Sequence, residues 1–412
     1  MPVTQDNPLG LYISIPFCRS KCTYCNFASG VYPASEHARY VDRLIEDLGA
    51  SGAWAARMGV ELPRRVDTVY LGGGTPSLLA PELIKRLFDA MRAEFDMDRD
   101  AEITVECAPG QIANQTLQAL RTAGVNRVSL GVQSFIDREA AATGRLHSRV
   151  VVLEDLSRLR AVGIANLSVD LIAGLAGQTF ASWEESLAVL AASGVPHASV
   201  YMLEVDEDSR LGREVLAQGT RYHAGLVPSD DAVAQMYAIA IDRLGGAGLR
   251  QYEISNFCRP GFESRHNLRY WLRRPYLGLG LDASSALFAS DAARPSCLLR
   301  STTSDDLKAY LAAASPAETE WLSADRQHEE AWFLGLRLSA GVEVAAVERE
   351  FGQAMVAPAL VVVRRLVEDG LLLFDGKTVR LTARGRLLSN DVFQEFLELR
   401  TETAEAEAEM RT

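Results

Sequence analysis

The chain alternates short apolar runs rich in β-branched residues with longer amphipathic stretches, and this alternation constrains the fold most. The six runs are residues 11–15, 66–71, 102–107, 127–131, 166–171 and 198–203. Stretches with helical periodicity separate them. Strands that alternate with helices pair in parallel through crossover helices. We therefore predict an α/β fold with a partial (β/α)6, TIM-like barrel, although the pattern alone does not distinguish a barrel from an open sheet.

The last quarter of the chain has a different pattern. Residues 326–337, 344–351 and 357–369 show helical periodicity, and two short apolar runs then flank Asp375-Gly376, a dipeptide typical of hairpin turns. Helices followed by a hairpin predict a smaller α+β domain of winged-helix type. A length of 412 residues also favours two domains. We expect a barrel domain over residues 1–290, a C-terminal domain over 300–400 and a disordered acidic tail over 401–412.

Charge and hydropathy exclude several classes of protein. The formal net charge of -12 disfavours binding to a phosphate backbone, so we expect no nucleic-acid partner. No stretch approaches the roughly 18 apolar residues that a membrane-spanning helix needs, although peripheral contact with a membrane stays compatible with the sequence. Residues 1–10 lack the basic and then apolar pattern of a secretory signal. These features predict a cytoplasmic protein without a transmembrane segment.

Three of the six cysteines form a tight cluster just after the first predicted strand. Cys18, Cys22 and Cys25 have the spacing C-x3-C-x2-C, and thiolates are the usual ligands of iron–sulfur clusters. Three thiolates leave one iron of a cubane open to another ligand, whereas structural zinc normally takes four protein ligands. Position 27, where a fourth ligand would fit, is Phe27. Buried or zinc-binding cysteines are the disfavoured alternative.

Polar and glycine-rich positions follow the ends of the predicted strands. They are Tyr12, Gly72–Thr75, Glu106, Gln133, Asp170 and Glu204. In parallel barrels the chemistry gathers at the C-terminal ends of the strands. Glycines let the backbone approach a ligand closely, and carboxylates accept hydrogen bonds from ribose hydroxyls or an ammonium group. Each residue alone is as readily a cap or turn residue, but their recurrence on successive strands favours a site.

Several of these motifs resemble the HemN/HemW branch of the radical-SAM superfamily. The resemblance rests on Leu-Tyr-Ile-Ser-Ile-Pro-Phe-Cys at 11–18, Cys25-Asn26-Phe27 and Gly-Gly-Gly-Thr-Pro at 72–76, and it extends over residues 11–397. It implies a radical-SAM barrel whose three clustered cysteines hold a [4Fe–4S] cluster, with S-adenosylmethionine chelating the open iron. One-electron reduction, by a donor such as flavodoxin or ferredoxin, would then give a 5′-deoxyadenosyl radical.

The resemblance also implies roles for single residues. Positions that match contacts to the S-adenosylmethionine on the cluster are Tyr12, Gly73 and Glu106, with Tyr24 near the adenine. Positions that match contacts to a second S-adenosylmethionine in coproporphyrinogen dehydrogenases are Gly74, Thr75, Gln133, Arg145 and Asp170. The chain is therefore expected to bind one molecule of S-adenosylmethionine, or two. Arg145 and Asp170 would serve equally well as a structural ion pair.

Further features separate the branches of this family. The dehydrogenases usually have a cysteine where this chain has Phe27, and a longer N-terminal extension. Residues 252–257 and the stretch from His266 to Trp271 look like the signature of HemW-type heme chaperones, so the segment 252–285 is expected to carry the heme motif. The resemblance implicates His266 in heme binding, and imidazole is a common axial ligand of heme iron. There are two alternatives: His266 only hydrogen-bonds a loop, or Cys258 is the heme ligand instead.

Some positions depart from the family pattern. Ser14 and Ser284 stand where histidine is usual, Asn26 where aspartate is usual, and Asp282 where glycine is usual. A serine does not replace imidazole as an iron ligand, which leaves the heme ligand set open. We predict a HemW-like chaperone that binds the cluster, S-adenosylmethionine and heme and delivers heme to a target protein. The alternatives are an oxygen-independent coproporphyrinogen III dehydrogenase of porphyrin biosynthesis and a two-SAM radical methyltransferase.

Overall fold

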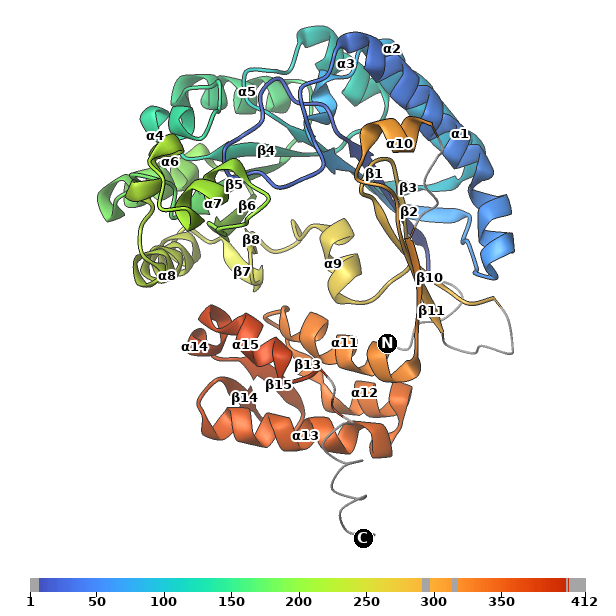
Figure 1. The fold of residues 1–412 in the computed structure, drawn as a ribbon, viewed down its shortest axis with the longest axis vertical. Helices are drawn as coiled ribbons and strands as arrows, with labels where there is room; N and C mark the ends of the chain where they lie inside the picture. Colours follow the sequence, from blue (N-terminus) through green and yellow to red (C-terminus); the bar gives the residue numbers. More distant parts are fainter. Residues whose placement is uncertain (1–6, 291–296, 313–317, 398, 400–412) are drawn as a thin grey trace.

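A curved sheet with a parallel centre dominates the larger part of the molecule (Figure 1). The computed structural model describes residues 7–290, 297–312, 318–397 and 399, and the predicted acidic tail over 401–412 lies outside them. The six central strands pair in parallel in chain order. They are β1 (Leu9–Ile15), β2 (Arg65–Gly73), β3 (Asp96–Cys107), β4 (Arg127–Gln133), β5 (Asn166–Ala173) and β6 (His197–Met202). The predicted partial barrel is confirmed.

Helices cover the convex side of this sheet (Figure 1). The crossover helices are α1 (Ala34–Met58), α2 (Pro81–Glu94), α3 (Asn114–Thr122), α4 (Asp137–Ala142), α5 (Arg149–Ala161) and α6 (Phe180–Ser193). The strands place buried apolar residues at every second position, as in β1 with its buried Leu9, Leu11, Ile13 and Ile15. Successive side chains of a strand point to opposite faces of the sheet, so this recurrence gives each strand one apolar face, which explains why the sequence pattern identified the strands.

Short strands, all antiparallel except β9, extend both edges of the sheet, and the sequence did not predict them. On one edge β9 (Tyr276–Leu279) pairs with β1 in parallel, followed by β10 (Ser284–Phe288), β11 (Leu298–Thr302) and β12 (Glu318–Leu322). On the other edge β8 (Asn256–Cys258) and β7 (Arg250–Glu253) follow β6. Strands β11 and β12 therefore belong to the sheet of the larger unit, although they lie beyond the boundary expected near residue 290.

Among its described residues, the larger unit has six further helices. They are η1 (Pro76–Leu78), α7 (Arg210–Leu216), η2 (Arg221–Leu226), α8 (Asp230–Gly246), α9 (Arg265–Trp271) and α10 (Leu307–Leu311). Of these, α8 packs against α6 and β6. Helix α9 lies on the concave side of the sheet, where it packs against β2 (Figure 1). None of the helices in the described part of the chain has the length and apolar character needed to cross a membrane.

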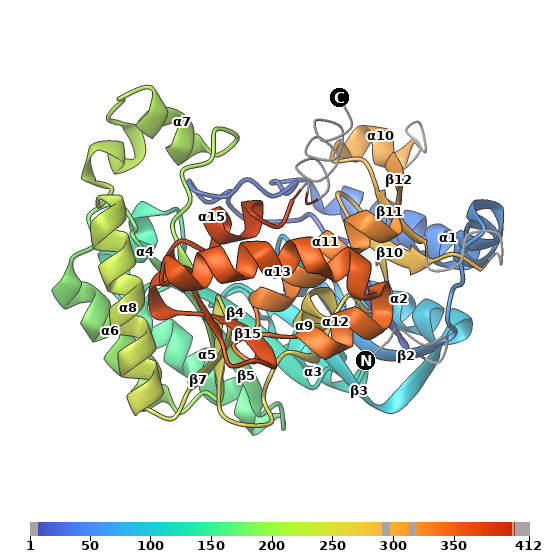
Figure 2. The same ribbon diagram turned by 90° about the horizontal axis from the view of Figure 1, so that it is seen from below.

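The C-terminal unit has its own apolar core around Trp332, Val356, Val363 and Phe396. Its elements are α11 (Ala324–Leu336), β13 (Val342–Glu343), α12 (Val344–Phe351), α13 (Gln353–Glu368), β14 (Leu372–Phe374), β15 (Thr378–Leu381), α14 (Ala383–Leu387) and α15 (Ser389–Gln394). The hairpin of β14 and β15 pairs with β13 in a three-stranded sheet. Both views show this unit beside the open side of the barrel (Figure 2).

Backbone contacts join the two units. Leu338 forms an antiparallel bridge with Glu253 at the end of β7. The amide of Ile254 donates to the carbonyl of Arg337 at 3.1 Å, and the amide of Ser339 donates to the carbonyl of Tyr252 at 2.9 Å. The end of α11 is therefore fixed against the turn between β7 and β8.

Candidate functional site

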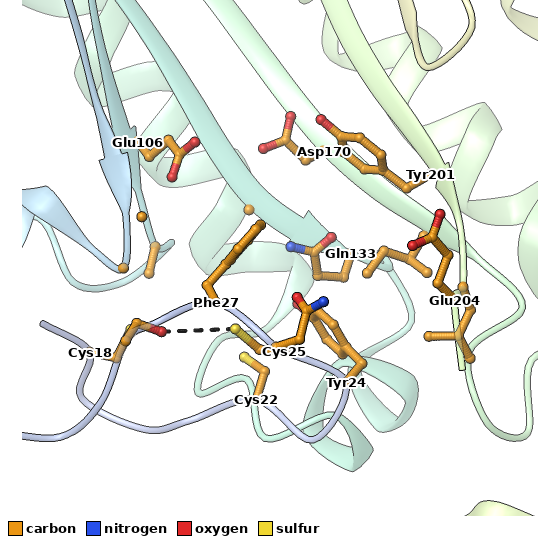
Figure 3. A pocket seen from close by; sticks show the side chains of 18 of the residues that line it. Cys18, Cys22, Tyr24, Cys25, Phe27, Glu106, Gln133, Asp170, Tyr201 and Glu204 are labelled. Carbon is orange, nitrogen blue, oxygen red and sulfur yellow. Dashed lines mark hydrogen bonds between the residues drawn. The ribbon is translucent and has the colours of Figure 1, made fainter. Parts of the chain in front are cut away.

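A cavity of about 420 Å³ lies where the carboxyl ends of the strands face the cysteine loop (Figure 3). The sequence predicted ten cofactor-binding residues and three cysteine ligands. The cavity lining contains all of them except Tyr12 and His266. The lining positions are Cys18, Cys22, Tyr24, Cys25, Gly73, Gly74, Thr75, Glu106, Gln133, Arg145 and Asp170. Residues from the ends of β2, β3, β4 and β5, from the cysteine loop and from the segment after α4 thus meet at one place.

The cysteine loop is held in shape by backbone hydrogen bonds. The amide of Cys18 donates to the carbonyl of Gly30 at 2.8 Å, which closes the loop at its base. Thr23 donates to Thr143 at 3.0 Å and accepts from Leu211 at 2.8 Å, so the loop is tied to two further segments. A loop anchored at its base and its middle presents its side chains toward the cavity in a fixed arrangement.

All three clustered cysteines are free thiols that line the cavity. The sulfur of Cys18 lies 3.9 Å from the hydroxyl of Thr75, and the sulfur of Cys25 lies 3.9 Å from the hydroxyl of Ser29. Burial raises the pKa of Cys18, and the neighbouring Cys25 and Cys22 add to this effect. A bound cationic cluster would favour the thiolate form of Cys18 against this effect.

The residues present fit an iron–sulfur cluster better than a single metal ion. In the described part of the chain, no three His, Cys, Asp or Glu side chains are gathered so as to hold one metal ion. The fit to a cluster rests on three free thiols in one cavity and on the chemistry of thiolate donors. Cys18, Cys22 and Cys25 would be its protein ligands.

The glycine turn after β2 brings the backbone against the base of the cysteine loop. The amide of Gly74 donates to the carbonyl of Ile15 at 2.8 Å, and the amide of Thr75 donates to that of Phe17 at 2.7 Å. A Cβ on Gly74 would lie 2.8 Å from both carbonyl oxygens. Gly73 has φ of +96°, which a side chain disfavours. Glycine is therefore required at both positions of this turn.

Two carboxyl groups face the cavity from β3 and β5, the strands on either side of β4 (Figure 3). The hydroxyl of Tyr70 donates to Glu106 at 2.8 Å, and burial raises the pKa of Glu106 to about 7. The hydroxyl of Ser129 donates to Asp170 at 2.9 Å, and burial also raises the pKa of Asp170. A ligand with positive charge would stabilise the ionised form of both groups.

Arg145 reaches the cavity beside the cysteine loop. Its Nη2 donates to the hydroxyl of Tyr24 at 3.0 Å, and Asp170 is bonded to Ser129 instead, so the alternative Arg145–Asp170 ion pair is not formed among the described residues. Burial lowers the pKa of Arg145, but Tyr24 and Cys22 outweigh it and raise that pKa. A Cβ on Gly131 would lie 2.9 Å from Nη2, so glycine makes room for the guanidinium.

Gln133 ends β4 in an uncommon backbone conformation. Its φ is +69°, in the left-handed region, and the register with β5 shifts between Gly131 and Gln133. Residues held in such conformations cluster at functional sites. The bulge brings the side chain of Gln133 to the cavity wall (Figure 3).

Tyr12 and His266 lie outside the cavity lining. Both ring nitrogens of the fully buried His266 have partners, with Nδ1 at 3.0 Å from the hydroxyl of Thr68 and Nε2 at 2.9 Å from the hydroxyl of Tyr270. Burial and then Arg269 lower the pKa of His266 to about 3, so the ring is neutral. The ring of Tyr12 stacks on that of Tyr70 with centroids 6.2 Å apart. These residues build the packed interior beneath the site.

The C-terminal unit supplies cavity residues that the sequence did not indicate. Arg337, Ser389 and Asn390 line the cavity together with Ile254 and Ser255. Ser389 and Asn390 lie in no segment that the sequence pattern distinguished, and Arg337 is the last residue of the helix predicted over 326–337, where no motif indicated a contact with the site. Only the docking of α11 against the turn between β7 and β8 places them there.

Comparisons with known proteins agree with this architecture. Residues 12–190 match the model of the Radical SAM superfamily, and residues 322–388 match the HemN C-terminal domain. The heme chaperone HemW of Lactococcus lactis is 33% identical over 396 residues, which is 95% of this chain and 98% of that protein. HemW of Mycobacterium tuberculosis is 35% identical over 393 residues, covering 95% of each chain.

A solved structure shares the fold over nearly the whole chain. Coproporphyrinogen III oxidase, HemN, from Escherichia coli, titled a radical SAM enzyme, superimposes with a TM-score of 0.78 and 24% identity. The match covers 95% of this chain and 90% of that one. This likeness concerns the arrangement of the barrel and the C-terminal unit.

Proposed function

This chain belongs to the HemW family of radical-SAM proteins, and from this premise we propose that it binds a [4Fe–4S] cluster, S-adenosylmethionine and heme, and delivers heme to a heme-accepting target protein. The observation that carries the proposal is the single cavity that holds the three free thiols, the glycine turn and the strand-end carboxyl groups. Thiols that must stay reduced favour the cytoplasm as its compartment.

In this proposal, different residues of the chain bind the cluster and S-adenosylmethionine. Cys18, Cys22 and Cys25 hold the cluster. The chemistry that such a cluster supplies is one-electron reduction of bound S-adenosylmethionine, with electrons from a donor such as flavodoxin or ferredoxin. The turn at Gly73 and Gly74 offers backbone groups at close range.

Carboxyl and amide groups of the strand ends complete the pocket for S-adenosylmethionine. Glu106 faces the cavity and accepts from Tyr70, so it is positioned to accept a further hydrogen bond from the ligand. Gln133, Arg145 and Asp170 line the same cavity and would contact a second molecule. Tyr24 is fixed by its bond to Arg145 and would lie beside the adenine.

Heme ligation by His266 is part of the proposal, and it requires that His266 give up a hydrogen bond. Iron binding requires a free ring nitrogen, whereas Nε2 is 2.9 Å from the hydroxyl of Tyr270. Helix α9 would therefore have to shift so that iron replaces Tyr270 as the partner. The low pKa of His266 favours this exchange chemically, because a neutral imidazole is the form that binds iron.

The cluster is tested by anaerobic reconstitution with iron and sulfide. We expect the wild-type protein to gain stoichiometric iron and sulfide and a broad visible absorbance. Cys22→Ala should lose most of both. Cys297→Ala removes another half-buried free thiol that does not line the cavity, and it should behave as the wild type.

The carrier function is tested by hemin titration followed by transfer to the apo form of a heme protein. Saturable binding and transfer faster than from free hemin are expected. Absence of binding would refute the proposal. Conversion of coproporphyrinogen III to a vinyl product would instead assign this chain to the dehydrogenase branch.

A further inference from the structure

Arg337 enters the cavity from the C-terminal unit, directly after α11 ends at Leu336. Its backbone is fixed, because its carbonyl accepts from Ile254 at 3.1 Å and the next residue, Leu338, bridges to Glu253. The side chain lines the same cavity as the three cysteines. An arginine thus stands at a defined position on the wall opposite the barrel.

The guanidinium of Arg337 packs against aromatic rings but has no anionic partner. Its Cζ lies 4.4 Å from the ring centroid of Trp271 and 5.7 Å from that of Phe393. Nε is buried without a hydrogen-bond partner, and the guanidinium forms no ion pair within the described residues. A partly buried cation in this state is costly unless an anion joins it.

The nearest carboxylates do not satisfy this cation. Glu253 accepts from the amide of Ser255 at 3.3 Å and from the side chain of Asn256. Burial lowers the pKa of Arg337, whereas Glu253 and Glu204 raise it through space. Both carboxylates therefore favour the charged form through space, but neither forms an ion pair with Arg337 among the described residues.

The surroundings of Arg337 suit a flat ligand with a carboxylate at its edge. A guanidinium binds a carboxylate with two parallel hydrogen bonds, and stacking on Trp271 holds its plane in advance. Ser255, Ser389 and Asn390 add neutral polar groups to the same wall, and a volume of about 420 Å³ is within the range of ligand pockets. Trp271 is also the last residue of the segment that begins at His266, so this segment meets the cavity at Arg337.

We propose that Arg337 recognises a carboxylate of the ligand at this end of the cavity. Resting on the proposed function, the proposal identifies this carboxylate as a propionate of a tetrapyrrole. Arg337 is then a specificity-determining residue. It selects tetrapyrroles with free acid side chains, whereas apolar packing alone would accept their esters equally well.

The test compares hemin with hemin dimethyl ester, in which both propionates are esterified, on the full reconstituted chain. Hydrogen bonds to charged groups predict that wild type prefers hemin by about tenfold or more. Arg337→Met keeps the apolar stem and should abolish the preference by weakening hemin alone. Arg337→Lys keeps the charge without the fork and should retain part of the preference.

Arg273→Met is the matched control. Arg273 also joins the two units, through an ion pair with Glu350 at 2.7 Å, and also stacks on an aromatic ring, Phe351, but it does not line the cavity. This variant should keep the wild-type preference.

The outcomes separate the inference from the function on which it rests. Equal affinity of wild type for hemin and its ester overturns the inference and leaves heme carriage standing, and this comparison needs no variant to fold. An equal loss for both ligands in Arg337→Met also overturns it, because the residue is then structural. No saturable binding of either ligand removes the proposed function together with the inference.

Discussion

Glu106→Gln tests whether the cavity floor disfavours a charged carboxyl group before any ligand binds. The side chain ends β3, faces the cavity and accepts from Tyr70 at 2.8 Å. Burial raises its pKa from 4.5 to about 7. Glutamine keeps the size and the acceptor for Tyr70 but carries no ionisable proton, so the variant isolates the cost of the charge.

The magnitude follows from the raised pKa. Between about pH 4.5 and pH 7 the folded protein binds more protons at this group than the unfolded chain, so the free energy of unfolding falls as pH rises and levels off above pH 7. The full effect is about 3 kcal/mol, of which about 2 kcal/mol falls between pH 5 and pH 8. Wild type should therefore lose about 2 kcal/mol more than Glu106→Gln over that interval.

Urea unfolding of the cluster-free protein at pH 5, 6, 7 and 8, followed by tryptophan fluorescence, measures this difference. Glu46→Gln changes an exposed carboxylate in the middle of α1 and should follow the wild type. If wild type and Glu106→Gln show the same pH dependence, the reasoning about burial at Glu106 is refuted.

Two further substitutions test the glycine turn and the buried histidine. Gly74→Ala should abolish binding of S-adenosylmethionine, measured by equilibrium dialysis, because the added methyl group meets two backbone oxygens at 2.8 Å. The control is Gly52→Ala in α1, where the methyl group meets no atom within 4 Å. This control should raise the free energy of unfolding by about 0.5–1 kcal/mol. His266→Ala leaves two hydroxyl partners unpaired and should lower the free energy of unfolding by about 2–4 kcal/mol. The same variant should bind hemin less tightly, and unchanged hemin affinity in a folded variant would contradict its role as ligand.

The central fold was predictable because each strand has one apolar face that is buried. Apolar residues therefore recur at every second position, as at Leu167, Val169 and Leu171 of β5. The start of β3 was missed because its first residues, from Asp96 to Asp100, are mainly charged and mostly exposed. The short edge strands β8 and β10 have three and five residues, which is too few for a periodic pattern.

The candidate site also has a part that the sequence predicted and a part that it did not. Residues at the strand ends could be predicted because parallel topology alone brings them to one edge of the sheet. Arg337 and Asn390 could not, because their approach depends on how the C-terminal unit docks, through contacts such as the Glu253–Leu338 bridge. Tyr12 does not follow this rule, because it is the middle residue of β1 and packs on Tyr70 outside the cavity lining.

The structure shows the local backbone at two departures from the family pattern, Asp282 and Ser14. Asp282 has φ of +51°, which explains why glycine is usual there and why aspartate, which tolerates this region, is accepted. The carbonyl of Ser14 accepts from Tyr40 at 2.7 Å, and the hydroxyl of Tyr40 accepts from Leu281 at 2.7 Å, so the joint between β1 and this turn uses no side chain of residue 14. Histidine is therefore dispensable for the fold at these places. Since serine does not bind heme iron, a heme carried by this chain depends on other groups. Helix α9 carries two candidate groups for contact with heme, His266 at one end and Trp271, stacked on Arg337, at the other.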